Sequence, residues 1–312
     1  MTAISDTYAA ATTLSRPGAV RARWFRRNFD TEARKGYTLV APTLLAAIAG
    51  LALPTIGLIL YSFWTQDYLT IDRTFTLENY RVIASEPIYG DLLLRSILMS
   101  AAATITTVLL AYPIAYFIAF HGGRHQALWM FLITVPFWTS YLLRVFAWKV
   151  ILGFNGVINS GLMYIGLISE PLEFLLYNPT AVIITLAHAW APFAVLPILV
   201  SLQKIDPLLL EAANDLGDGT WQRFRRVTLP LSLPGVLSAA LIVFIPTVGD
   251  YVTPALVGGT SGYMIANTIQ AQFGRANNAP LGAALAIVSM IAVTSISLGI
   301  MGMIRLMGGR HR

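Results

Sequence analysis

Six long apolar stretches constrain this chain more than any other feature of its sequence. An α-helix needs about 20 mainly apolar residues to cross roughly 30 Å of hydrocarbon, and each stretch is long enough to do so. The apolar residues run continuously instead of alternating, which argues against a β-barrel. The sequence therefore predicts an all-α membrane protein with six transmembrane helices. These lie at 37–63, 92–120, 127–150, 181–201, 235–257 and 282–305.

The composition excludes several classes of protein. Charged residues make up 12% of the 312 residues and hydrophobic residues 56%, with a mean hydropathy of +0.66. Soluble domains carry about 25% charged residues, so a soluble domain is excluded, and so is a disordered chain. The chain has no cysteine, which excludes a disulfide framework, a zinc–thiolate site and a cysteine nucleophile. In so apolar a chain the net charge of +6 indicates membrane-flanking loops, not nucleic-acid binding.

The distribution of basic residues predicts the orientation. Fifteen of the 21 Lys and Arg residues lie in the N-terminal tail, the 121–126 turn, the 202–234 loop and the C-terminal segment, and only three lie in the other loops. Because positive residues gather in short cytoplasmic loops, both termini and the 202–234 loop are expected in the cytoplasm. Residues 1–36 and 307–312 are expected to be cytoplasmic tails flanking a membrane domain at 37–306, with no cleaved signal peptide.

Familiar catalytic and nucleotide-binding sequences are absent. The chain contains no G-x-x-x-x-G-K-[ST], no H-E-x-x-H and no G-x-S-x-G, so it is not expected to bind ATP or to act as a hydrolase by itself. Its four histidines are scattered and form no metal-ligand spacing. No catalytic residue, metal site or cofactor is predicted.

The 202–234 loop carries signals for two short helices. Asp206 can cap the first helix, with Pro207 in its first turn, and Gly217 suits the left-handed position that ends it. Thr220 is expected to cap the second helix and Pro230 to stop it.

The first of these helices is expected to be amphipathic. Leu209, Ala212, Ala213 and Leu216 recur at spacings of three and four and share one face. Two adjacent alanines make this face small, so it could enter a groove of another protein. A helix lying on the membrane surface or against its own bundle remains an alternative.

The same loop resembles the signature loop of the permease subunits of binding-protein-dependent ABC importers. The pattern is Glu211-Ala212-Ala213, then Gly217, and then Val227, Leu229 and Pro230, with Val227 standing where the family usually has Ile. The resemblance implies a type I importer permease fold in a bacterial cytoplasmic membrane. It assigns the loop as a coupling helix that docks on a cytoplasmic ATPase. The residues it implicates in coupling are Glu211, Ala212, Ala213, Asp215, Leu216, Gly217 and Pro230.

Three further stretches resemble the spermidine/putrescine branch of this family. They are 75–80, 135–144 and 244–254, and the first 36 residues lie outside the resemblance. The resemblance implies polyamine uptake by alternating access. It also implies separate ATPase subunits that bind the ATP, a second homologous permease and an external binding protein. Related branches carry similar stretches for other small organic solutes, so that alternative stays open.

Asp250 is the only acidic residue deep in an apparent span. An ionised side chain there costs roughly 2.5–3.5 kcal/mol, so such residues usually face a cavity or a partner. Pro246, Gly249 and Pro254 surround it and predict a kinked or broken helix. With Tyr251, Asp250 could attract an ammonium group. An ion pair with Arg144 or Lys149, or a place nearer the outer surface, remains open.

Trp138, Tyr141 and Arg144 form a second group of candidates. Their spacing of three places them on one side of a helix, and Pro136 indicates a kink. Trp138 and Tyr141 are candidates for the substrate pathway, and aromatic anchoring at the membrane interface is the alternative. Arg144 could pair with a lipid phosphate or with an acid on the docked binding protein.

Two other functional classes compete with an importer subunit. A stand-alone secondary transporter or channel would show inverted repeats or several interior acidic residues, but only Asp250 is present and no clear repeat is seen. A membrane-embedded enzyme would need a nucleophile and a base, and the sequence shows no such pair.

Overall fold

The computed structural model describes residues 17–68 and 70–308, and the chain divides into two compact units, residues 1–57 and 58–312. The first unit holds most of helix α1 (Pro17–Ser62). The predicted tail at 1–36 is therefore helical from Pro17 onward, while its first 16 residues lie outside the described part of the chain. The final four residues of the predicted C-terminal tail lie outside it as well.

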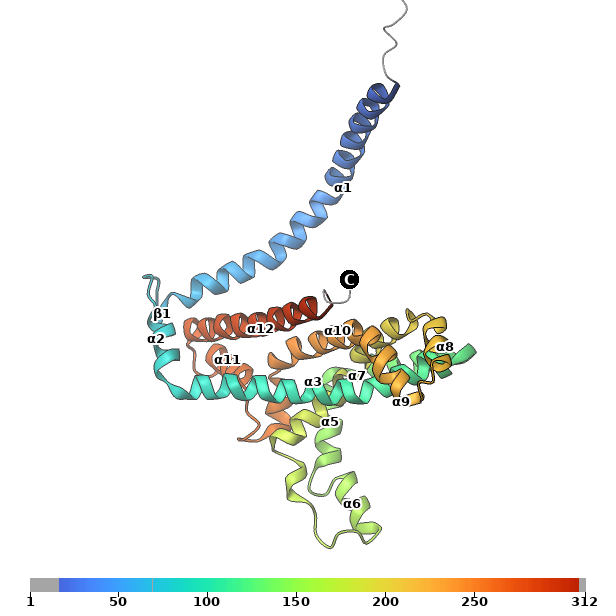
Figure 1. Ribbon diagram of the computed structural model, residues 1–312. Coiled ribbons are helices and arrows are strands. Elements are labelled where there is room, and N and C mark those ends of the chain that lie inside the picture. The colour runs from blue at the N-terminus through green and yellow to red at the C-terminus, as the bar shows by residue number, and fades with distance from the viewer. Residues whose placement is uncertain (1–16, 69, 309–312) are drawn as a thin grey trace, which may run out of the picture. The chain divides into compact units, whose positions relative to one another are not determined.

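The second unit is almost entirely helical (Figure 1). Its elements are β1 (Thr65–Asp67), β2 (Thr70–Asp72), α2 (Glu78–Ser85), α3 (Pro87–His121), η1 (Gly123–His125), α4 (Gln126–Thr134), η2 (Val135–Trp138), α5 (Tyr141–Leu152), α6 (Val157–Tyr164), η3 (Glu173–Leu175), α7 (Pro179–Gln203), α8 (Pro207–Asp215), α9 (Thr220–Arg223), η4 (Phe224–Thr228), α10 (Leu229–Val248), η5 (Pro254–Gly258), α11 (Ile265–Gly274) and α12 (Ala279–Gly308). The two strands pair only with each other, in an antiparallel hairpin.

Helices α3, α7 and α10 pack against one another and form the centre of the second unit. Small residues occupy the contact surfaces and are fully buried, as at Ala111 and Ala115 on α3, Ala194 on α7 and Ala239 on α10. Lipid tails are as apolar as the side chains, so helices in a membrane associate through close packing, which small residues permit. The packing of the three helices therefore depends on how closely these small-residue faces fit together.

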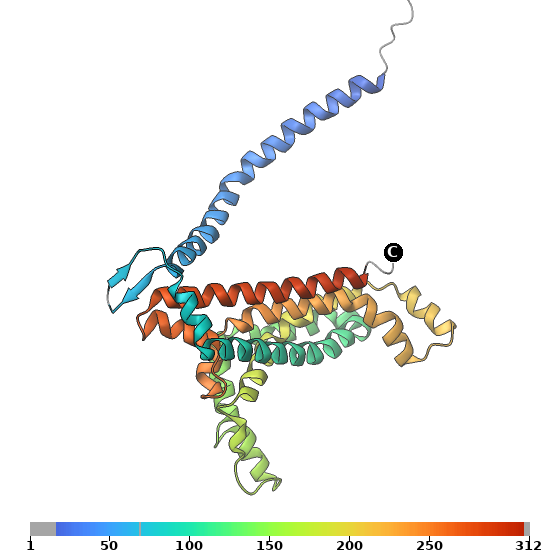
Figure 2. The ribbon, with the colours of Figure 1, turned by 60° about the vertical axis from the view of Figure 1, so that its left-hand side comes forward.

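The two polar regions of the second unit lie at opposite ends of the bundle. In both views the β1–β2 hairpin and α2 lie at one end, and α8 and α9 lie at the other (Figures 1 and 2). The segment around α6 projects to one side. The hairpin and the α8–α9 region are therefore placed to face opposite sides of a membrane.

Six described helices are long and apolar enough to cross a membrane, in agreement with the sequence. Two predicted boundaries are wrong. The predicted 127–150 span is broken at η2 and Thr139, where Pro136 removes a backbone donor, and the long apolar helical stretch is 141–164. The predicted 235–257 span begins earlier, at Thr220, and ends at Val248, before the Gly249–Tyr251 break. That break confirms the predicted interruption of the helix around Asp250.

Gly235 marks the closest approach of α10 to α7. A Cβ atom at this position would lie 2.5 Å from the Pro197 carbonyl oxygen and 3.0 Å from the Ser201 hydroxyl oxygen. The residue is buried, so no side chain can turn away into open space. Glycine is therefore required here by the packing of the two helices.

A Gly235→Val substitution is expected to push α10 away from α7. Overpacking of this kind costs about 1–3 kcal/mol, so the purified protein should unfold at a lower temperature. Gly299→Val is the matched control, because a Cβ at Gly299 on α12 meets nothing within 4 Å. Equal melting temperatures for the two variants in the same detergent would contradict the assigned contact.

Candidate functional site

The connection between α7 and α10 forms a capped and tightly turned segment, residues 206–228. The Asp206 carboxylate accepts a hydrogen bond from the Leu208 N–H at 2.9 Å, which confirms the predicted cap of α8. Gly217 has φ +86°, which confirms the predicted left-handed end. The Asp218 N–H donates to the Ala213 carbonyl at 3.0 Å across this turn. These bonds fix where α8 begins and ends.

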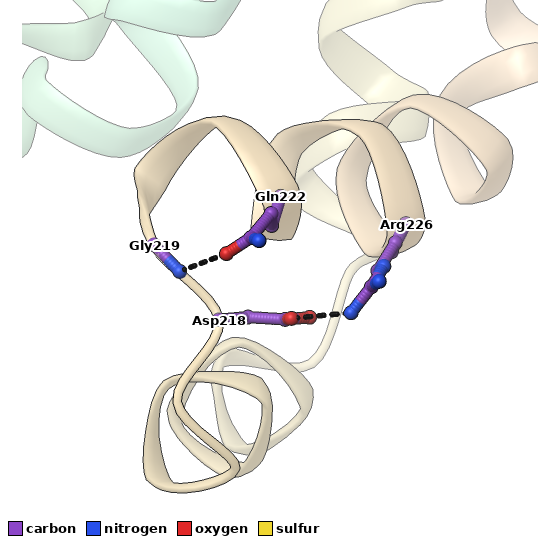
Figure 3. A network of polar contacts seen from close by, with 4 residues as sticks. All are labelled: Asp218, Gly219, Gln222 and Arg226. Carbon is purple, nitrogen blue, oxygen red and sulfur yellow. Dashed lines mark hydrogen bonds and ion pairs between the residues drawn. The ribbon is translucent and has the colours of Figure 1, made fainter.

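Two side-chain contacts hold the turn after α8 (Figure 3). Arg226 and Asp218 form an ion pair with a nitrogen–oxygen distance of 2.6 Å. The Gln222 side chain accepts a hydrogen bond from the Gly219 N–H at 2.8 Å. The prediction that Thr220 caps the second helix is wrong, because Gly219 occupies the cap and Gln222 satisfies its backbone donor.

The prediction that Pro230 stops the second helix is also wrong. The helix continues from Thr220 to Val248, and the five residues before α10 form a π-helical turn, with the Leu229 N–H donating to the Phe224 carbonyl. Proline has no N–H, and its ring clashes with the carbonyl four residues earlier. Widening the preceding turn relieves this clash without ending the helix.

The predicted coupling residues lie mostly at the surface. Glu211, Ala212, Asp215 and Gly217 are exposed, and Leu216 is 88% exposed. Ala213 is the exception at 7%, and it faces inward. Leu208 and Trp221 are also largely exposed, which leaves an apolar surface at this end of the bundle.

A cavity of about 410 Å³ lies among η2, α5, α7 and α10 and includes two of the predicted pathway residues, Tyr141 and Asp250. Its wall combines aromatic rings with one carboxylate and one guanidinium group. The lining residues are Phe137, Thr139, Tyr141, Arg144, Ala189, Trp190, Phe193, Pro246 and Asp250.

The Asp250 carboxylate ties the break after α10 to helix α5. One oxygen accepts from the Val252 N–H at 2.8 Å and from the Thr253 N–H at 3.4 Å. The other oxygen accepts from the Thr253 hydroxyl at 2.6 Å and from the Tyr141 hydroxyl. Asp250 therefore caps the turn that follows the break and holds Tyr141 at the cavity wall.

The other two predicted pathway residues do not line this cavity. Trp138 belongs to η2 and is 76% exposed, and its ring contacts Phe131 with centroids 5.7 Å apart. The extended backbone at Thr139 separates it from α5, so the prediction that Trp138 and Tyr141 share one helix face is wrong. Tyr251 lies on a different cavity, among α10, α11 and α12.

Arg144 lies on the cavity wall and has no carboxylate partner among the described residues. Its guanidinium stacks on the Phe137 ring, 4.4 Å from the centroid, and its Nη1 donates to the Ala189 carbonyl at 3.3 Å. Neither Arg144 nor Lys149 forms an ion pair with Asp250 in the structure. Within residues 17–68 and 70–308, no group forms a hydrogen bond with the buried Nε of Arg144 or with the indole nitrogen of Trp190.

Several residues of the cavity were not identified from the sequence. Trp190 and Phe193 lie in an ordinary apolar span, and nothing in that pattern distinguishes them from packing residues. Thr253, which binds the Asp250 carboxylate but does not line the cavity, was not identified either.

The sequence model of one family, described as "Binding-protein-dependent transport system inner membrane component", matches residues 108–305. The chain is 37% identical to the spermidine/putrescine transport system permease protein PotB of Escherichia coli (strain K12), over 77% of this chain and 87% of that protein. It is 36% identical to PotB of Haemophilus influenzae, over 75% of this chain and 82% of that protein.

Solved structures share the fold at low sequence identity. A bacterial ABC transporter that imports the acidic polysaccharide alginate matches 89% of this chain and 98% of its own chain, with a TM-score of 0.68 and 19% identity. At this identity the match concerns the fold alone.

Proposed function

The chain belongs to the family of inner-membrane components of binding-protein-dependent transport systems, the permease subunits of ABC importers, and we propose that the solute it conducts is a polyamine. The observation that carries the proposal is the 37% identity to PotB over most of both chains. The cavity around Asp250 supports it, because a carboxylate among aromatic rings suits an ammonium group. The family is one of transport subunits, so the chain is not an enzyme.

We assign the 206–228 segment as the site that docks on a cytoplasmic ATPase, which binds and hydrolyses the ATP. The exposed Leu208, Leu216 and Trp221 offer an apolar surface for a groove. The capping bonds and the Asp218–Arg226 pair give this surface a fixed shape. The other proposed partners are an external binding protein and a second permease, which we infer to be a homologous but different chain.

Substitutions at Gly217 should separate coupling from folding. A Cβ at Gly217 meets nothing within 4 Å, so the constraint is the positive φ alone. A β-branched residue there costs about 1–2 kcal/mol or more, whereas Asn adopts this conformation readily. Gly217→Val should therefore lower uptake severalfold with normal membrane abundance, and Gly217→Asn should retain normal uptake.

Glu211→Lys should also lower uptake, with less ATPase recovered on purification. Normal uptake in the Val and Lys variants would remove the assignment.

We propose that the 206–228 segment and both termini face the cytoplasm. The basic residues of the 202–234 loop and the opposite placement of the β1–β2 hairpin support this orientation. The chain has no cysteine, so single-cysteine variants can be labelled without background. In spheroplasts, a membrane-impermeant maleimide should label Phe75→Cys and leave Leu216→Cys unlabelled until the membrane is opened. The reverse pattern would overturn the orientation.

A second candidate is a solute that carries a carboxylate as well as an ammonium group. Arg144 favours it, because this guanidinium lies in the same cavity as Asp250 and has no acidic partner in the structure. A bidentate carboxylate would suit such a guanidinium. Putrescine and 4-aminobutanoate differ only in one terminal group, so they separate the two candidates.

Uptake of labelled putrescine, spermidine and 4-aminobutanoate should be measured in a deletion strain with and without this chain. The proposal expects the two polyamines to be taken up. Asp250→Asn keeps one oxygen for the Val252 N–H but removes the charge. Charge-assisted hydrogen bonds are about twice as strong as neutral ones, so uptake should fall severalfold, and more for spermidine, which carries more charge.

Tyr141→Phe is the matched control for Asp250→Asn. It removes one hydroxyl from the carboxylate and leaves the charge in place, so the ratio of spermidine to putrescine uptake should not change. Membrane abundance is measured beside uptake for both variants. Wild-type uptake of both polyamines by the Asp250→Asn variant would show that the carboxylate has no part in conduction.

A further inference from the structure

Phe224 connects the 206–228 segment to helix α3 through aromatic contacts. It is the first residue of the π-helical turn η4 and is half-buried. Its ring meets Tyr112 edge-on, with centroids 5.8 Å apart and planes at 86°, and meets Tyr116 with centroids 6.3 Å apart and planes at 73°. Tyr112 and Tyr116 are four residues apart and lie on one face of α3. We call these three rings the aromatic joint.

The joint lies beside Pro113, the proline in the interior of α3. Pro113 is between the two tyrosines, and it leaves one backbone carbonyl of the helix without its usual donor. Helices bend most readily at such positions. The Tyr112 hydroxyl also bonds the buried Ser232 hydroxyl of α10 at 2.8 Å. Phe224 therefore contacts both sides of a potential bend in α3, next to a polar link to α10.

Several contacts tie the parts of the 206–228 segment together. The Asp218–Arg226 pair joins the turn after α8 to η4, and the Gly219–Gln222 bond closes the start of α9 (Figure 3). Ala213 is buried on the inner side of α8, and α8 contacts η4. The π-helical turn is the irregular part of the connection to α10, and such turns often occur at functional positions. A displacement of α8 therefore reaches η4 and the Phe224 ring.

Helix α3 continues to the opposite end of the bundle. There the Ser96 hydroxyl accepts a hydrogen bond from the Ile265 N–H of α11 at 2.7 Å, and Arg95 donates to the Ser261 carbonyl at 3.3 Å. Helix α3 also packs along α7, which lines the cavity. A bend in α3 would therefore change contacts at the cavity and at the far end.

We propose that Phe224 is a positioning residue that transmits displacement of the 206–228 segment to α3 through the aromatic joint. The inference rests on the proposed importer function, and it does not depend on which solute is carried. Without the ring contacts, the ATPase would still dock on the exposed surface of α8 and α9. Movement of the docked ATPase would then displace α3 less, so ATP hydrolysis would no longer drive transport efficiently.

The test uses the complete importer in proteoliposomes: this chain, its partner permease, the ATPase and the binding protein. Phe224→Leu keeps an apolar side chain and removes the ring, while Phe224→Tyr keeps the ring. Phe117→Leu is the matched control, because Phe117 is on the same stretch of α3 but its ring contacts His121 and Trp129. Two quantities are measured: solute accumulated per ATP hydrolysed, and stimulation of ATP hydrolysis by the binding protein.

In the Phe224→Leu variant, both quantities should fall about tenfold. The ATPase should still be recovered with the complex, because Phe224 is half-buried and does not belong to the exposed docking surface. Phe224→Tyr and Phe117→Leu should behave as wild type. Loss of transport without loss of ATPase recovery is a result that a purely structural role would not produce.

Two results would overturn the inference while the importer function stands. One is a wild-type ratio of transport to hydrolysis in Phe224→Leu. The other is a Phe224→Leu complex that loses its ATPase, since the ring would then support assembly. If the wild-type complex accumulates no polyamine but its hydrolysis is stimulated by the binding protein, only the solute assignment fails, and the stimulation still tests Phe224. A wild-type complex with neither activity overturns both proposals.

Discussion

A backbone N–H shielded from water needs an acceptor from the protein, and this constraint accounts for the placement of Asp250. Helix α10 ends at Val248, and the backbone donors of Val252 and Thr253 have no helical partner in the preceding break. The Asp250 carboxylate accepts from both. Its second oxygen then binds the hydroxyls of Thr253 and Tyr141, which fixes the wall of the cavity. The break in the helix, the carboxylate charge and the cavity wall are therefore linked through the hydrogen bonds of Asp250.

Proline produces two other irregularities of the bundle. Pro136 breaks the third span and places Phe137 and Thr139 at the cavity, and Pro230 widens the turn that carries Phe224. Each of these prolines removes one backbone donor and crowds a carbonyl, whereas Pro192 and Pro197 lie inside the continuous helix α7. Pro113 removes a donor from α3 next to the aromatic joint.

The sequence predicted what depends on composition and local signals. Runs of about 20 apolar residues located the six spans, and Asp206 and Gly217 located the ends of α8, because caps and left-handed turns need particular residues. The effect of Pro230 was not predicted. A proline can either end a helix or widen the preceding turn, and packing against neighbouring helices determines which of the two occurs. The contact between Asp250 and Tyr141 joins residues 109 positions apart, so no local pattern predicts it.

The central claim is that the 206–228 segment of this permease docks on the ATPase. Leu216 is 88% exposed at the end of α8, and a cysteine placed there would be the only one in the chain. Membranes containing the complete importer can be treated with a short crosslinker that joins a cysteine to a neighbouring lysine. The account predicts that Leu216→Cys crosslinks to the ATPase subunit, while Phe75→Cys on the opposite end does not. A crosslink from Phe75→Cys, or none from Leu216→Cys in an importer that transports normally, would contradict it.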